Sequence, residues 1–216
     1  MFSRSRFLFG ALCITLLLSA CGQSSQKYAA SKSEGVYFTV PPSWNEISTQ
    51  RLTSHEATSK EAGAAEILAL VKWQLAFSPA RQMSPHDIFS FVATDAPVAY
   101  ARVRSLLPAE ANSVSYNSLR NVIVPITQWV TNPTKETPEF NIIDDYEVVE
   151  KGARGVRTIY SFTDGGKSQT VDQTSMVSND RQMMYIFVIR CSTQCYNKNY
   201  KVMTKISDSF TVRGAK

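Results

Sequence analysis

The sequence predicts an α+β fold, an α-β-α sandwich in which helices cover a mainly antiparallel sheet. Two observations support this class. Four strand-like segments follow one another in the second half of the chain, separated only by short polar turns, and connections this short can join only antiparallel neighbours. Segments with helical spacing of apolar residues precede and follow this run, and helices with one apolar face bury it against a sheet.

Seven segments have the apolar alternation or clustering of strands. They are residues 36–40, 71–77, 98–106, 142–150, 156–163, 168–177 and 183–190. In the second of these, Trp73 and Phe77 fall on one face, which predicts a half-buried strand. The last four form a predicted meander, because the separators 152–155, 164–166 and 179–180 contain residues that supply the positive φ of tight hairpins.

Two short helices are predicted in the middle of the chain. Ser84 is a suitable N-cap, Pro85 suits the first helical position, and Asp87 stands near the positive end of the helix. Ser115 can cap a second helix, whose end is limited by Pro125. The apolar stripe of this second helix consists of Leu119, Val122, Ile123 and Ile126.

A longer helix is predicted over residues 196–209, near the end of the chain. Tyr200, Met203 and Ile206 have the spacing of one buried face, which we expect to lie on the sheet. On or beside the solvent face lie Lys198, Lys201 and Lys205.

The first 20 residues are predicted to be a lipoprotein signal peptide. Arg4 and Arg6 precede an uncharged apolar run over residues 7–18, which is shorter than the roughly 20 residues of a membrane-spanning helix. The following Leu18-Ser19-Ala20-Cys21 has the pattern of a lipobox, whose cysteine thiol receives a diacylglyceryl group before cleavage. The sequence therefore predicts a protein anchored through Cys21 in membrane lipid, at the extracytoplasmic face. An ordinary signal peptide followed by a chance cysteine is the alternative.

Residues 21–34 contain little that could be buried and are predicted to form a flexible tether, followed by one globular domain over residues 35–216. Cleavage before Cys21 removes two of the 23 basic residues and none of the 18 acidic ones, so the net charge falls from +5 to +3. The denser basic groups, such as Arg102 with Arg104, have the spacing of solvated faces. We therefore expect no nucleic-acid partner.

Two parts of the sequence resemble known families. Residues 35–44 are similar to the first strand and the Pro-x-x-Trp turn of the PsbP family, the extrinsic proteins of photosystem II, and residues 206–212 resemble the end of that family's chains. Residues 95–100 and 190–196 look closer to actinobacterial envelope lipoproteins of the LpqN type. The resemblance implies a PsbP-like α-β-α sandwich and carries no catalytic residue.

Cys191 and Cys195 are the strongest candidates for special chemistry. An exported domain is in an oxidising compartment, where two cysteines four residues apart at a strand-to-helix turn can form a structural disulfide. Zinc would need two further ligands from His55, His86 or distant acids, and redox catalysis uses Cys-x-x-Cys spacing. We therefore interpret the pair as a disulfide.

The remaining candidate residues favour plain structural roles. His55 lies in a polar stretch and His86 in the first turn of a predicted helix, so we expect both to be exposed. No Gly-x-Ser-x-Gly motif marks a nucleophilic serine. Asp144 and Asp145 are adjacent in a predicted strand and therefore point to opposite faces, so we expect solvated carboxylates and not a metal site. No cofactor is predicted either. Trp129 follows a predicted helix and enters a proline-bearing loop, where a partly exposed aromatic side chain is a candidate partner contact.

Together these features predict a non-enzymatic cell-envelope lipoprotein that serves as a binding or accessory module for a partner protein or a small ligand. An envelope hydrolase whose site the sequence does not reveal is one alternative. A photosystem II assembly factor is another, if the host is photosynthetic.

Overall fold

The computed structural model describes residues 26–90 and 92–214. The strands are β1 (Lys27–Ser31), β2 (Val36–Val40), β3 (Asn45–Ile47), β4 (Val71–Ser78), β5 (Val98–Ser105), β6 (Phe140–Val149), β7 (Ala153–Asp164), β8 (Lys167–Ser178), β9 (Met183–Ser192) and β10 (Thr211–Val212). The helices are α1 (Thr49–Glu56), α2 (Ala64–Ala69), α3 (Pro85–Phe89), α4 (Pro108–Ser113), α5 (Tyr116–Arg120), α6 (Ile126–Thr131) and α7 (Thr193–Asp208). None of the helices within these ranges is long and apolar enough to cross a bilayer.

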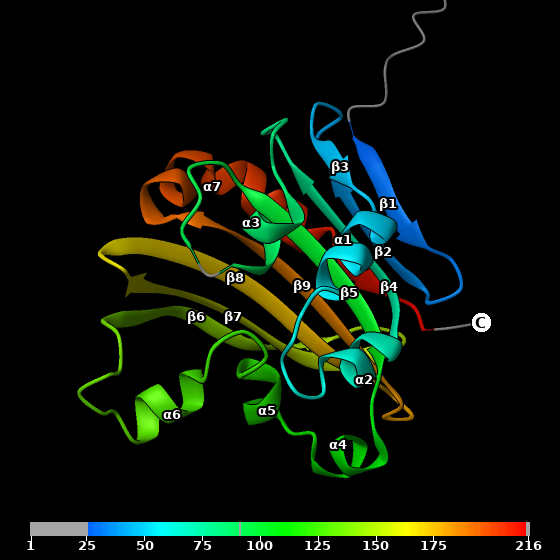
Figure 1. Cartoon of the computed structure of the whole chain (residues 1–216). Coiled ribbons are helices and arrows are strands. Elements are labelled where there is room, and N and C mark those ends of the chain that lie inside the picture. Colours follow the sequence, from blue (N-terminus) through cyan, green and yellow to red (C-terminus); the bar gives the residue numbers. More distant parts are fainter. Residues whose placement is uncertain (1–25, 91, 215–216) are drawn as a thin grey trace, which may run out of the picture.

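A seven-stranded antiparallel sheet with the order β3-β4-β5-β9-β8-β7-β6 forms the centre of the fold. Strands β6 to β9 follow one another in the chain and each pairs with the next, which confirms the predicted meander. The α+β class is likewise confirmed, because helices cover this sheet on both faces (Figure 1).

Different secondary-structure elements pack on the two faces of the main sheet. On one face lie α7 and a small sheet with the order β1-β2-β10. The core of this layer is rich in aromatic rings, and Phe187 stacks on Phe210 and contacts Phe38. On the other face, α4 to α6 and the half-buried Trp129 cover β7 to β9, while α1 and α3 cover the β4–β5 end (Figure 1).

Helix α7 begins three residues earlier than the sequence predicts, because Ser192 is its N-cap and accepts a hydrogen bond from the Cys195 amide. Met203 and Ile206 are buried against the sheet as predicted. The prediction for Tyr200 is wrong, since this side chain is 53% exposed. The buried stripe runs through Tyr196 instead, and Tyr200 packs only edge-on against the Tyr196 ring.

The predicted flexible tether is wrong for residues 27–31, which form strand β1. This strand pairs along its whole length with β2, from Lys27 opposite Val40 to Ser31 opposite Val36. The composition of this segment gives almost no hydrophobic signal for a strand. The strand is held by its backbone hydrogen bonds to β2 and by burial of the small Ala29 side chain. The signal peptide and Cys21 lie outside the described residues.

The single helix predicted from Ser115 is two short helices. Helix α5 ends at Arg120 and α6 begins after Pro125, which is its N-cap and cannot continue a preceding helix. Val122 and Ile123 therefore lie in the connecting segment, half-buried. The helix predicted from Ser84 is confirmed, with a capping box between Ser84 and Asp87.

Only some of the residues predicted to have positive φ in the hairpin turns have it in the structure. Gly165 and Gly166 both have positive φ, as the predicted tight turn requires. Gly152 and Gly155 do not, and in the 179–180 turn the positive φ belongs to Arg181. Gly155 lies inside β7, where a Cβ atom would come within 1.9 Å of the Ser175 carbonyl oxygen. It is therefore a site of close backbone approach, not part of a turn.

Strand β6 is one free edge of the main sheet. Its side chains are mostly exposed, and the apolar ones among them include Ile142, Ile143, Tyr146 and Val149. The pairing with β7 shifts between Ile142 and Asp144, which is a β-bulge. The opposite edge, β3, has only three residues.

Candidate functional site

A cleft crosses the main sheet between the two helical groups on its α1–α6 face. Three hollows of about 350, 830 and 180 Å³ meet there, and the Arg102 side chain lines all three. Ile67, Phe89 and Val122 each line two of them, so the hollows are neighbours. We refer to these three hollows together as the Arg102 cleft.

The floor of the cleft is built from β5 and β9. Alternate residues of β5 point to this face, and each stands opposite a β9 residue on the same face. Tyr100 pairs with Val188, and Arg102 pairs with Ile186. Polar side chains from one strand thus stand beside apolar side chains from the other. The sequence interpretation of Arg102 and Arg104 as solvated residues is wrong, because each side chain is only 13% exposed.

Arg102 belongs to a chain of polar side chains under the wide hollow. Its Nη1 donates to Glu56 Oε1 at 2.7 Å, and the other oxygen of Glu56 accepts from Gln74 Nε2 at 2.7 Å. Tyr100 donates its hydroxyl to Gln74 Oε1 at 2.7 Å, and burial raises the pKa of Tyr100. The Nε of Arg102 is buried and has no hydrogen-bond partner among the described residues. One donor of this guanidinium is therefore buried without an acceptor, which is costly for a charged group.

Arg104 is fully engaged with an acid at the far end of the cleft. Its Nη1 and Nη2 donate to the two carboxylate oxygens of Glu110 at 2.8 and 2.7 Å. The hydrogen bond from Arg104 is the largest reason that the pKa of Glu110 is lowered, and the Leu107 amide adds to it. This pair fixes α4 to the sheet.

Arg190 is a buried cation whose hydrogen bonds go to neutral acceptors. Its guanidinium donates to the carbonyls of Asp87, Ile88, Ser90 and Val92, and to the side chain of Gln169. These carbonyls include the C-terminal end of α3, where a cation is favoured. The Asp87 carboxylate acts on Arg190 only through space, since it accepts hydrogen bonds from Ser84. Burial lowers the pKa of Arg190.

The 180 Å³ hollow combines positively charged and apolar lining residues. Arg102, Arg190 and Tyr100 line it, together with a mainly apolar wall. That wall includes Ile88, Phe89, Val98, Val122, Ile123, Ile186 and Val188. No carboxylate is among its described lining residues, whereas Glu56, Glu61 and Glu66 line the wide outer hollow. Apolar walls with a few convergent polar groups are typical of small-molecule sites.

His55 lines the wide hollow, and His86 lies next to it. The imidazole of His55 stacks on Phe89 with ring centroids 5.8 Å apart, and His86 lies edge-on at 6.2 Å. Within the described ranges, no hydrogen bond joins either imidazole to a serine or a carboxylate. Nor do those ranges contain a group of three or more histidine, cysteine or acidic side chains suited to a metal ion.

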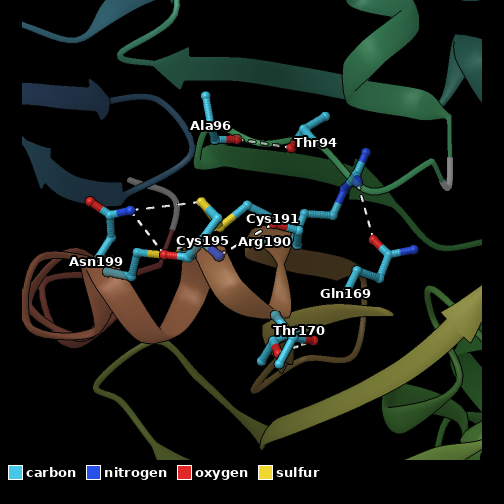
Figure 2. Close-up of a disulfide and its surroundings, with 11 residues drawn as sticks. Thr94, Ala96, Gln169, Thr170, Arg190, Cys191, Cys195 and Asn199 are labelled. Atoms are coloured by element: carbon cyan, nitrogen blue, oxygen red, sulfur yellow. Dashed lines mark hydrogen bonds between the residues drawn. A yellow bond between two sulfur atoms is a disulfide. The ribbon is translucent and has the colours of Figure 1, made fainter. Parts of the chain in front are cut away.

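Cys191 and Cys195 form a disulfide in the structure, with Cα atoms 5.9 Å apart (Figure 2). Asn199 donates its side-chain amide to the carbonyl of Cys195 at 2.9 Å, one turn further along α7. The disulfide thus closes the β9–α7 junction. Cys191 lies next to Arg190 in sequence but on the opposite face of β9, so the disulfide belongs to the α7 layer and not to the cleft.

The other predicted candidates have structural contacts. Trp129 packs against Phe140 and Phe162, with ring centroids 5.5 Å apart in both pairs, and its role as a partner contact stays a prediction. Asp145 is not a freely solvated carboxylate, because Arg120 donates to both of its oxygens. Thr158 also donates to Asp145, at 2.8 Å.

The architecture is an α+β sandwich with one large antiparallel sheet. The sequence itself matches no family model and no curated protein. Cyanobacterial PsbP (CyanoP) from Synechocystis sp. PCC 6803 has a similar solution structure, with 13% identity and a TM-score of 0.45 over 89% of this chain and 95% of that one.

Two further solved structures are similar over most of their length. LpqN, involved in cell envelope biogenesis of Mycobacterium tuberculosis, is 13% identical, with a TM-score of 0.46 over 87% of this chain and 91% of that one. The Ran-binding protein Mog1p of Saccharomyces cerevisiae is 9% identical, with a TM-score of 0.47 over 88% and 96%. The first two of these structures come from the two groups that the sequence resembles.

Proposed function

We propose that this chain is a lipid-anchored protein of the cell envelope that binds a small anionic ligand with an apolar body in the Arg102 cleft. The anchor is the lipid on Cys21, a proposal that rests on the sequence of the first 21 residues. Binding, rather than catalysis, is the role that the cleft supports best.

The observation that carries the proposal is the make-up of the 180 Å³ hollow. Two arginines face a mainly apolar space that no described carboxylate lines. Arg102 offers a buried Nε–H that lacks a protein partner, and Arg190 carries a positive charge whose hydrogen bonds go to uncharged oxygens. A carboxylate or similar anionic group in the hollow would offset the positive charge and would accept charge-assisted hydrogen bonds from guanidinium groups that turn toward it, and such hydrogen bonds are the stronger ones.

The size of the hollow limits the ligand. A space of about 180 Å³ holds a small anionic body, and the adjoining 350 Å³ hollow leaves room for an extension past Val122 and Ile186. Benzoate is a suitable probe because it combines one carboxylate with a compact apolar ring. Benzyl alcohol and benzylammonium have nearly the same shape and differ in charge.

The test uses the mature protein in lipid nanodiscs and saturation-transfer NMR with these three probes. We expect benzoate to bind at least about tenfold more tightly than benzyl alcohol, which is the value of one charge-assisted hydrogen bond. Benzylammonium should show no saturable binding. Equal binding of all three probes would contradict the proposal.

A double variant connects the binding to Arg102. In Arg102→Gln/Glu56→Gln both charges of the ion pair are removed together, so neither is left buried and unpaired. We expect benzoate binding to weaken about tenfold, while the exposed control Arg213→Gln keeps it unchanged. A folded double variant that binds benzoate like the wild type would refute the role of Arg102.

A further inference from the structure

The start of β1 limits how far the domain can lie from its anchor. Only five residue steps separate Cys21 from Gln26, the first described residue. A fully extended chain of that length spans at most about 18 Å. If Cys21 carries lipid, as the proposed function holds, the surface around Gln26 is kept beside the bilayer.

The surface around Gln26 is formed mainly by α7. A hollow of about 310 Å³ there has Gln26, Thr39, Lys201, Val202 and Lys205 among its lining residues. Lys198, Lys201, Val202 and Lys205 have the spacing i, i+3, i+4 and i+7, so they share one outward face of the helix. The end of the chain that leads to the anchor therefore emerges next to a row of lysines.

These lysines carry uncompensated charge. All three are exposed, and in the part of the chain that the structure describes none of them forms an ion pair. The only acid of α7 is Asp208, which binds Arg157 at 2.6 Å. Lys27 differs, because Glu46 lies 3.3 Å from its Nζ. The positive charge beside Gln26 is thus concentrated on the three lysines of α7.

Apolar side chains accompany the lysines. Val202 is 42% exposed between Lys201 and Lys205. Tyr28 is 75% exposed and stands opposite Thr39, a residue of the same hollow, on the outer face of the small sheet. Exposed tyrosines and lysines with long apolar stems are the side chains that suit a membrane–water interface.

We propose that Tyr28, Lys198, Lys201, Val202 and Lys205, which we call the α7 face, rest on the bilayer and bind anionic phospholipid headgroups. The short reach from Cys21 brings this face to the membrane, and its charge is complementary to that of the lipid. Lysines near an anionic surface are attracted to it within a Debye length.

The test compares lysine acetylation in the mature protein in three settings: nanodiscs containing phosphatidylglycerol, nanodiscs of phosphatidylcholine alone, and detergent. We expect Lys198, Lys201 and Lys205 to be labelled about fivefold more slowly in the phosphatidylglycerol nanodiscs, and 1 M salt to restore their rate. The matched controls are the exposed Lys151, between β6 and β7, and the exposed Lys167, the first residue of β8, and their rates should not change.

Each outcome has a separate meaning. Failure of the protein to co-elute with nanodiscs overturns the anchor and this proposal with it. Co-elution with equal labelling in both lipids overturns the docking face alone. Protection of the α7 lysines in intact cells but not in nanodiscs would mean that a protein covers the face, which also overturns the proposal.

Discussion

Arg157 of β7 donates through Nε and Nη2 to the two carboxylate oxygens of Asp172 on β8, both at 2.8 Å, and Asp172 is fully buried. The third contact of this guanidinium is Asp208 at the end of α7, at 2.6 Å. A buried ion pair thus ties the closing helix to the middle of the sheet.

The change Asp172→Asn should destabilise the domain by about 3 to 5 kcal/mol, because it leaves Arg157 buried without its main partner. Urea unfolding followed by circular dichroism measures this free energy. The double variant Arg157→Met/Asp172→Leu removes both charges and should lose much less. If the single and double variants were equally unstable, packing and not charge would explain the loss.

Truncation of Ile206 tests the packing of α7. Ile206→Ala should lower the free energy of unfolding by about 2 to 5 kcal/mol, because its side chain is buried against the sheet. The control Lys198→Ala on the same helix should change it by no more than about 0.5 kcal/mol. Equal unfolding midpoints for Ile206→Ala and the wild type would contradict the position of this helix.

The Arg104–Glu110 pair predicts a dependence of stability on pH. The folded pKa of Glu110 is lowered from its ordinary 4.5, so its contribution is present above that value and is lost as the pH falls through the folded pKa. Glu110→Gln should therefore reduce the melting temperature at pH 7. The difference from the wild type should shrink as the pH falls below 4.5. A difference that stays constant over this range would exclude the carboxylate as its cause.

The disulfide predicts that the protein, purified without reductant, has no reactive thiol at Cys191 or Cys195. Alkylation without reduction, followed by mass spectrometry, measures this. Replacing both cysteines by alanine should lower the free energy of unfolding by about 2 kcal/mol, since the closed loop is short. Rapid alkylation of the native, unreduced protein would contradict the prediction.

The proposed anchor predicts that the mature N-terminus is a lipid-modified Cys21 and that the protein partitions into detergent. Cys21→Ser should abolish the modification, although the uncleaved apolar segment can still hold the variant at the membrane. Mass spectrometry of the N-terminal peptide tests this. A lipid-free wild-type protein with a different N-terminus would disprove the anchor.

Local patterns were sufficient to predict the meander and α7, because each rests on residues close in sequence. The Arg102 cleft could not be predicted in this way. Glu56 and Arg102 are 46 residues apart and meet only because α1 packs on β4 and β4 pairs with β5. The sequence did contain one indication of the cleft, since Tyr100, Arg102 and Arg104 occupy alternate positions of a predicted strand and therefore share one face. Spacing alone did not distinguish buried arginines from solvated ones.

The free edge of β6 bears on how the folded chain avoids aggregation. An exposed ten-residue strand with several apolar side chains invites pairing with a second copy. Here Asp144, Asp145 and Glu147 lie in the middle of the strand, and the adjacent bulge interrupts its regular hydrogen-bonding pattern. A second β6 laid antiparallel along this edge would bring carboxylates against carboxylates, while the three-residue β3 offers too short a template at the other edge. The carboxylates and the bulge of β6 thus disfavour pairing with a second copy at one edge of the sheet. At the other edge, the short length of β3 has the same effect.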